Sequence, residues 1–118
     1  MPFELLVERA LTGLPASAQR LLEQVAVVIE EEPTSEQLRE NRLEPDDTLY
    51  GLYEGTPIVE YGADWVPLPN KISLFRLPLE ADFADPDELA AEVRRTVLHE
   101  LAHHAGFGEE GMRRLRLD

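Results

Sequence analysis

The three histidines of the chain lie within six residues, and two of them have the spacing of a metal-binding pair. Positions 99 to 103 read HExxH. On a helix, His99 and His103 lie about 40° apart around the axis and one turn apart along it, so both imidazoles can bind one cation. Glu100 lies about 100° from His99, where it can reach a water on that cation. The spacing therefore predicts a metal site with a general base beside it.

The alternative for these histidines is a structural role, which is the usual one for a single histidine in a helix. With 3 His and 17 Glu among 118 residues, HExxH is expected by chance roughly 0.01 times. The pair together with Glu100 therefore favours metal binding. His104 lies about 100° from His103, toward the apolar side of the helix. We expect it to face a buried carbonyl or carboxylate and not the metal.

A longer pattern, HExxHxxGxxE, supplies a candidate for the third ligand. Gly106 can adopt a positive φ, so the chain can leave the helix and turn back toward the metal. This turn would return Glu109, and its neighbour Glu110 is the alternative. Because the chain contains no cysteine, any metal must be bound by histidine and carboxylate, both ordinary zinc ligands.

The helix that would carry the motif has strong signals at both ends. Asp85 is a candidate N-cap, Pro86 suits the first helical position and Glu88 can complete a capping box. We expect the helix to continue to about Ala105 and to end at Gly106. Its apolar side, which should pack against a sheet, consists of Val97, Leu98, Leu101, Ala102 and Ala105.

The first half of the chain predicts helices on either side of a strand. One amphipathic helix follows Pro2 and ends at Gly13, and a second begins at Pro15. The β-branched run 25–29 is typical of a buried strand. Thr34 and Gln37 then form a capping-box pattern for a short helix that ends near Arg42.

The middle of the chain predicts further strands. Residues 48–53 and 58–61 flank the turn sequence EGTP and suggest a hairpin. A strand from Lys71 to Leu77 would end at Pro78, which favours a sheet edge. The aromatic residues of this region either line a cleft or, as we expect, pack in the core and loops; they are Tyr50, Tyr53, Tyr61 and Trp65.

Composition and charge limit the function classes. A chain of 118 residues predicts one domain over 1–118. Its formal charge of −13 repels phosphate backbones and anionic lipid, so nucleic-acid and membrane partners are not expected. The longest aliphatic run, 25–29, is far shorter than the ~20 residues that span a bilayer. The start of the chain lacks the features of a signal peptide, so we expect a cytoplasmic protein.

Four segments of the chain resemble one protein family. They read FELL from Phe3, VAVVIE from Val25, LYEGTP from Leu52 and RRTVLHELAHH from Arg94. With HExxHxxGxxE, the chain resembles the zincin metallopeptidases with an extended HExxHxxGxxH/D motif. It is most similar to the small bacterial minimal-zincin metallopeptidase family, formerly a domain of unknown function, and the resemblance covers essentially the whole chain.

The resemblance implies a compact zincin-like fold, a zinc site and a peptidase activity on peptide or protein substrates. It carries over His99 and His103 as zinc ligands, Glu100 as general base and Glu109 as third ligand. Glu109 stands where the metzincin pattern has histidine. Typical metzincins also have a long subdomain after the third ligand, with a methionine turn below the metal. Here only nine residues follow Glu109, and we interpret Met112 among them as a packing residue.

These observations lead to one preferred hypothesis. The fold is α+β, a small mixed or partly antiparallel sheet with the HExxH helix on one face. The function is zinc-dependent hydrolysis of peptide bonds, with an extended substrate aligned along an edge strand, for which 72–77 is the candidate. The alternative is a non-catalytic zinc-binding regulatory or protein-interaction module. Glu100 distinguishes the two, because a structural zinc needs no base.

Overall fold

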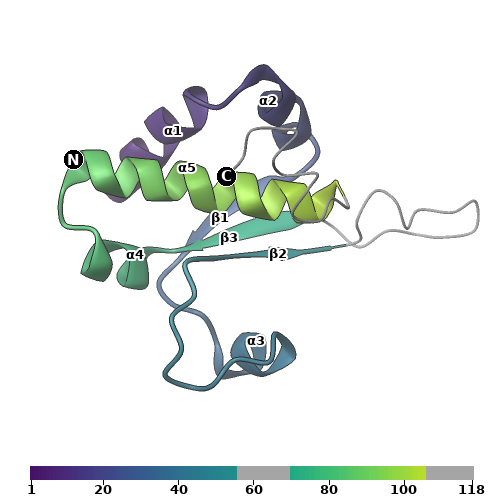
Figure 1. Cartoon of the computed structure of the whole chain (residues 1–118), viewed down its shortest axis with the longest axis vertical. Helices are drawn as coiled ribbons and strands as arrows, with labels where there is room; N and C mark the ends of the chain where they lie inside the picture. Colours follow the sequence, from purple (N-terminus) through teal and green to yellow (C-terminus); the bar gives the residue numbers. More distant parts are fainter. Residues whose placement is uncertain (56–69, 106–118) are drawn as a thin grey trace, which may run out of the picture.

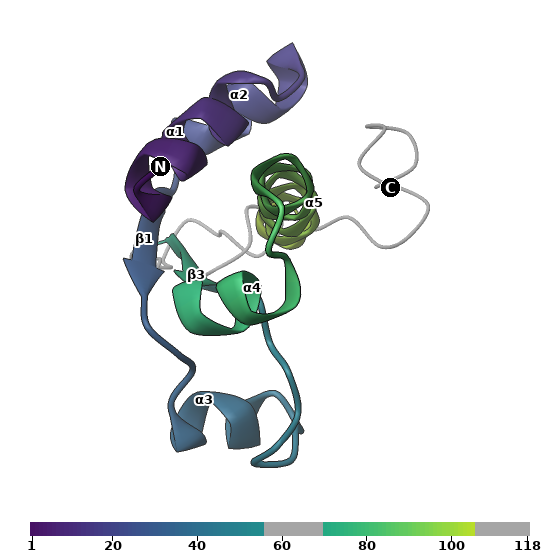
Figure 2. The same ribbon diagram turned by 90° about the vertical axis from the view of Figure 1, so that its left-hand side faces the viewer.

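The computed structural model describes residues 1–55 and 70–105, which form a small α+β fold. A three-stranded mixed sheet has α1, α2 and α5 on one face and α3 on the other (Figure 1, Figure 2). The elements in chain order are α1 (Phe3–Thr12), α2 (Ala16–Leu22), β1 (Ala26–Glu30), α3 (Ser35–Glu40), β2 (Gly51–Glu54), β3 (Lys71–Phe75), α4 (Arg76–Asp82) and α5 (Pro86–His104).

The strand order is β1-β3-β2, with β3 parallel to β1 and antiparallel to β2. The prediction that 72–77 forms an edge strand is therefore wrong, since β3 is central and Ile72, Leu74 and Phe75 are fully buried. Pro78 does not limit the strand, because the strand ends at Phe75 and Pro78 lies in the first turn of α4. A proline at that place removes only an N–H that the helix leaves unpaired.

The run 25–29 also has a different position from the one predicted. It forms β1, which lies at an edge of the sheet in the described residues and is half-exposed along most of its length. A continuous aliphatic run is typical of a strand that is buried on both faces inside a sheet. Here Val27 and Ile29 pack against the main core from the edge, so the prediction of a buried strand is wrong.

The predicted starts of the helices are confirmed. The α1 helix follows Pro2, and Gly13 is its C-cap. In α3, the Thr34 side chain accepts a hydrogen bond from the Gln37 N–H, and the Gln37 side chain accepts one from Thr34 N–H. These ends depend on residues within four positions of each other, which explains why sequence patterns predict them. The helix α4 was not predicted.

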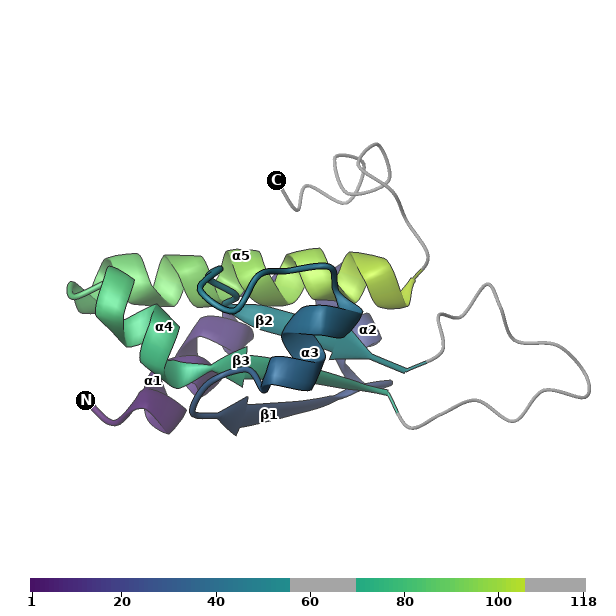
Figure 3. The same cartoon turned by 90° about the horizontal axis from the view of Figure 1, so that it is seen from below.

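The main hydrophobic core lies between the helices and the sheet. Its members come from α1, α2, β3, α4 and α5, and they include Phe3, Leu6, Val7, Ile72, Leu74, Leu79, Val93, Val97 and Leu101. A smaller buried group lies on the other face of the sheet, where α3 crosses the strands (Figure 3). It contains Leu38, Leu52 and Phe75. Both faces of the central strand are therefore covered.

Several predictions lie outside the described residues. They are the second hairpin strand at 58–61, Tyr61, Trp65, the turn at Gly106, Glu109, Glu110 and Met112. Among the helices that are described, none is long and apolar enough to cross a membrane.

Candidate metal centre

The helix α5 fixes the position of the HExxH side chains. Its Asp85 cap accepts hydrogen bonds from the N–H groups of Asp87 (3.1 Å) and Glu88 (3.0 Å), as predicted for this end. Val93, Val97 and Leu101 recur every four residues and are fully buried. This stripe holds the helix against the core and fixes its rotation about its own axis, so the direction of each remaining side chain is determined.

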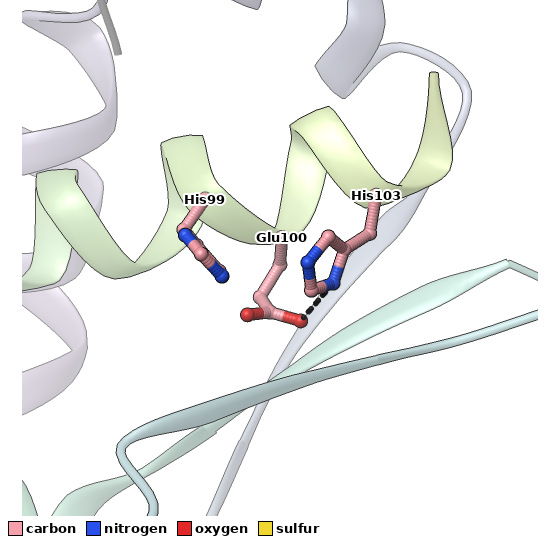
Figure 4. Close-up of side chains that lie close together, drawn as sticks. All are labelled: His99, Glu100 and His103. Carbon is pink, nitrogen blue, oxygen red and sulfur yellow. Dashed lines mark ion pairs between the residues drawn. The ribbon is translucent and has the colours of Figure 1, made fainter. Parts of the chain in front are cut away.

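His99, Glu100 and His103 come together on one side of α5. Each offers a ligand atom, and these atoms lie within 4.8 Å of one another. The two imidazole rings are 4.7 Å apart between centroids. Figure 4 shows all three side chains projecting from the helix toward the strands. The helical spacing of the motif therefore produces the cluster that it predicted.

Glu100 has two contacts that hold its carboxylate. The backbone N–H of Tyr53 in β2 donates a hydrogen bond of 2.8 Å to Oε1. The same oxygen lies 3.3 Å from Nδ1 of His103 (Figure 4). Glu100 is only 7% exposed, whereas His103 is exposed and His99 is half-buried. The acid of the motif is thus enclosed between the helix and the sheet, and its imidazole neighbour reaches solvent.

The contact with Glu100 shifts the pKa of His103. The hydrogen bond to the carboxylate raises the pKa of His103 above its usual value, burial opposes this, and the negative charge of Glu100 adds to the increase. A metal ion requires the neutral imidazole. Protonation of the His103 ring would therefore compete with metal binding at a higher pH than it would for an isolated histidine.

The donor set suits a divalent metal ion. Two imidazoles and a carboxylate are the ligand types that such ions use in proteins, and they are already gathered by one helix. His99 and His103 share the row that can bind one ion. Glu100 is held against Tyr53 and lies beside that row.

His104 lies apart from this cluster, as predicted. It is fully buried, its Nε2 is 2.8 Å from Oε1 of Gln24, and its Nδ1 is 3.1 Å from the Tyr53 hydroxyl oxygen. The partner of Nε2 is the side-chain amide of Gln24, which is an exposed residue, so the expected buried carbonyl or carboxylate is not what the ring contacts. Burial lowers the pKa of His104, which favours the neutral ring.

A groove of about 330 Å³ leads to the cluster. One side is residues 48–51, and the other is the α5 residues Glu92, Arg95, Thr96, His99 and Glu100. Gly51 permits this close approach, because a Cβ at this position would lie 2.4 Å from Cγ2 of Thr96 and 3.2 Å from the Ser73 carbonyl oxygen. Strand and helix are therefore in close contact at Gly51 and Thr96, one turn before Glu100.

Sequence reasoning missed the groove, although part of its signal was present. Glu92, Thr96, His99 and His103 are spaced by four, three and four residues and so share one side of a helix. The Tyr53 contact had no such signal, because every residue except proline has a backbone N–H.

The expectation that Tyr50 packs is met by Phe83, with ring centroids 5.5 Å apart. A hydrogen bond to Asp82 is the main cause that raises the pKa of Tyr50 to about 12.

Comparison with known proteins identifies one family. The family described as zincin-like metallopeptidase matches residues 22–117. No curated protein matches the chain.

Proposed function

The chain belongs to the zincin-like metallopeptidase family, and we propose on this basis that it is a zinc-dependent peptidase with Glu100 as its general base. The observation that carries the proposal is the enclosed position of Glu100 beside two imidazoles. A purely structural zinc site has no use for a carboxylate fixed next to the ligand row. A hydrolytic site needs one.

The proposed ligands are His99, His103 and Glu109. The two histidines are the pair brought together by α5. Glu109 follows from the extended motif and lies outside the described residues. A zinc ion held by these residues would supply a Lewis acid for the scissile carbonyl and would lower the pKa of the attacking water.

Glu100 would move the proton in this reaction. Its Oε1 already accepts the Tyr53 N–H and lies next to His103, so Oε2 is the oxygen that we assign to receive the proton of the attacking water. The same oxygen would then deliver the proton to the leaving amine. The Tyr53 N–H donates to Oε1 and so helps to hold the carboxylate in place.

The edge of β2 that faces away from β3 is our candidate for aligning the substrate, in place of the central strand; within residues 1–55 and 70–105 no other strand pairs with it. The Phe75 N–H donates to the Tyr50 carbonyl at 2.9 Å, so Tyr50 bonds inward to β3. Backbone groups alternate in an antiparallel pair, and those of Gly51 therefore point away from β3. Gly51 also lines the groove. An extended peptide could pair with this edge and present its carbonyl at the cluster.

The decisive experiment is Glu100→Gln. We expect a folded, zinc-loaded protein with kcat lower by about 10² to 10⁴, the range for loss of general acid–base catalysis. Chelator-sensitive cleavage of a peptide library measures activity, and elemental analysis measures zinc. Glu88→Gln, an exposed position in the first turn of α5, is the matched control and should keep full activity.

Two results would reject this function. Turnover at the wild-type rate in Glu100→Gln would remove Glu100 from the reaction. A zinc-loaded wild-type protein that cleaves nothing in the library would favour the non-catalytic module.

A further inference from the structure

Tyr53 bonds to α5 through both its main chain and its side chain. Its N–H donates to Glu100 Oε1 at 2.8 Å, and its hydroxyl oxygen lies 3.1 Å from His104 Nδ1. Glu100 and His104 are four residues apart, so they occupy the same side of the helix on successive turns. Two turns of α5 therefore contact a single residue of β2.

The side chain of Tyr53 is fixed at its far end. Its hydroxyl also hydrogen-bonds to Oδ1 of Asn70 at 2.8 Å, directly before β3. His104 is fully buried and is itself held by Gln24 at 2.8 Å. The hydroxyl thus lies between two groups from different parts of the fold, and one of them has no access to water.

Gly55 shows how closely the chain packs around this hydroxyl. A Cβ at position 55 would lie 2.3 Å from Oδ1 of Asn70 and 3.0 Å from the hydroxyl oxygen of Tyr53. Its φ of +152° is also a backbone angle that residues with a side chain rarely adopt. Glycine suits this turn because any side chain at position 55 would collide with Asn70 and Tyr53. A larger residue here would therefore disturb the Tyr53–Asn70 hydrogen bond.

We propose that Tyr53 is a positioning residue for Glu100, with His104 holding the tyrosine in place. This inference rests on the proposed function of Glu100 as the base. The N–H that bonds Glu100 and the ring that bonds His104 belong to one residue, so movement of the ring moves the strand and the N–H. A base must be held within about 0.5 Å of its productive position, and loosening this contact should reduce turnover more than substrate or zinc binding.

The test compares variants that remove the contact between the Tyr53 hydroxyl and the His104 ring from one side or the other. Tyr53→Phe removes the hydroxyl. His104→Gln carries an amide at the position of Nε2 and loses the Tyr53 contact, whereas His104→Asn carries an amide at the position of Nδ1 and keeps it. We expect kcat about 10-fold lower in the first two variants, with KM and zinc content unchanged. His104→Asn should restore most of kcat.

A control separates positioning from loss of stability. Gln19→Ala removes a 2.7 Å hydrogen bond to the Leu11 carbonyl, which joins α2 to α1 and involves none of Tyr53, Glu100 and His104. It should lower Tm and leave kcat unchanged. An equal fall of kcat in Gln19→Ala would overturn the proposal, and so would wild-type kcat in Tyr53→Phe. If the His104 variants do not fold, Tyr53→Phe, which keeps the ring, still decides the question.

A second measurement needs no activity. Amide hydrogen exchange at residue 53 in the zinc-free protein should be slow, and faster in Tyr53→Phe, His104→Gln and Glu100→Ala. Unchanged exchange in the first two variants would overturn the proposal even if the wild type cleaves nothing. If the wild type is inactive but exchange at residue 53 is faster in Tyr53→Phe and His104→Gln, the positioning contact is supported although the proposed function fails.

Discussion

Two pairs of side chains, each spaced by four residues, alternate along the end of α5 and have opposite surroundings. His99 and His103 have rings 4.7 Å apart on the side that reaches solvent. Glu100 and His104 are buried and both contact Tyr53. A step of one residue rotates a side chain by about 100°. The comparison teaches that this single step separates a pair suited to bind an ion from a pair that joins helix to sheet.

The neighbouring histidines His103 and His104 show what the difference does to protonation. The hydrogen bond that His103 donates to Glu100 is the main cause of the raised pKa of His103. Burial alone lowers the pKa of His104. The same residue type is thus driven toward the charged form on one side of the helix and toward the neutral form on the other.

The largest expected effect follows from removing a member of the first pair. His99→Ala or His103→Ala should weaken zinc binding by about 100-fold or more, since too few protein ligands remain. Competition with a chelator and elemental analysis measure this, with one zinc per chain expected in the wild type. His104→Asn, from the second pair, should keep its zinc. Equal zinc affinity in all three variants would break the comparison.

The next effect concerns the close contact between β2 and α5. Gly51→Ala places a Cβ 2.4 Å from Cγ2 of Thr96, and such overpacking costs about 1–3 kcal/mol of unfolding free energy. Thr96→Ser removes that methyl, so the double variant should recover part of the loss in a urea titration. Additive losses in the double variant would show that strand and helix are not in contact there.

A smaller effect should identify the ligand that completes the first pair. Glu109→Ala should weaken zinc binding by about 10-fold or more, because the turn at Gly106 is expected to return this side chain to the metal. Glu110→Ala is the matched control and should bind almost normally. A chelator titration that finds the larger loss in Glu110→Ala would show that the register of the motif is wrong.

The smallest effect is in the pH dependence of the two histidines. His103 has a raised pKa when folded, so its contribution to stability is complete below about 6.5 and is lost as pH rises through the folded value. His104 has a lowered pKa, so its contribution is lost as pH falls below about 6.5. NMR titration of the zinc-free protein should give a lower pKa for His103 in Glu100→Gln. An unchanged value would exclude the carboxylate as the cause.

Zinc affinity should follow the titration of His103. Protonation of its ring competes with the metal, so affinity should begin to weaken at a higher pH than for a histidine of ordinary pKa. Affinity that stays constant from pH 7.5 to 5 would contradict the proposed ligand.

The sequence by itself determined what depends on neighbours along the chain. The cap at Asp85, the capping box of Thr34 and the meeting of His99 with His103 all involve residues within four positions. Helical geometry fixes such relations whatever the rest of the fold does. The cluster of His99, Glu100 and His103 was therefore predictable before the structure.

Only the tertiary structure decided which strand is central and where Glu100 and His104 find partners. Tyr53 is 47 residues from Glu100 and 51 from His104 along the chain. The run 71–75 became the central strand because β1 and β2 pair with it from opposite sides. Proline and aliphatic runs describe a strand's own preferences, whereas its neighbours depend on how the helices and strands pack together to bury their apolar surfaces.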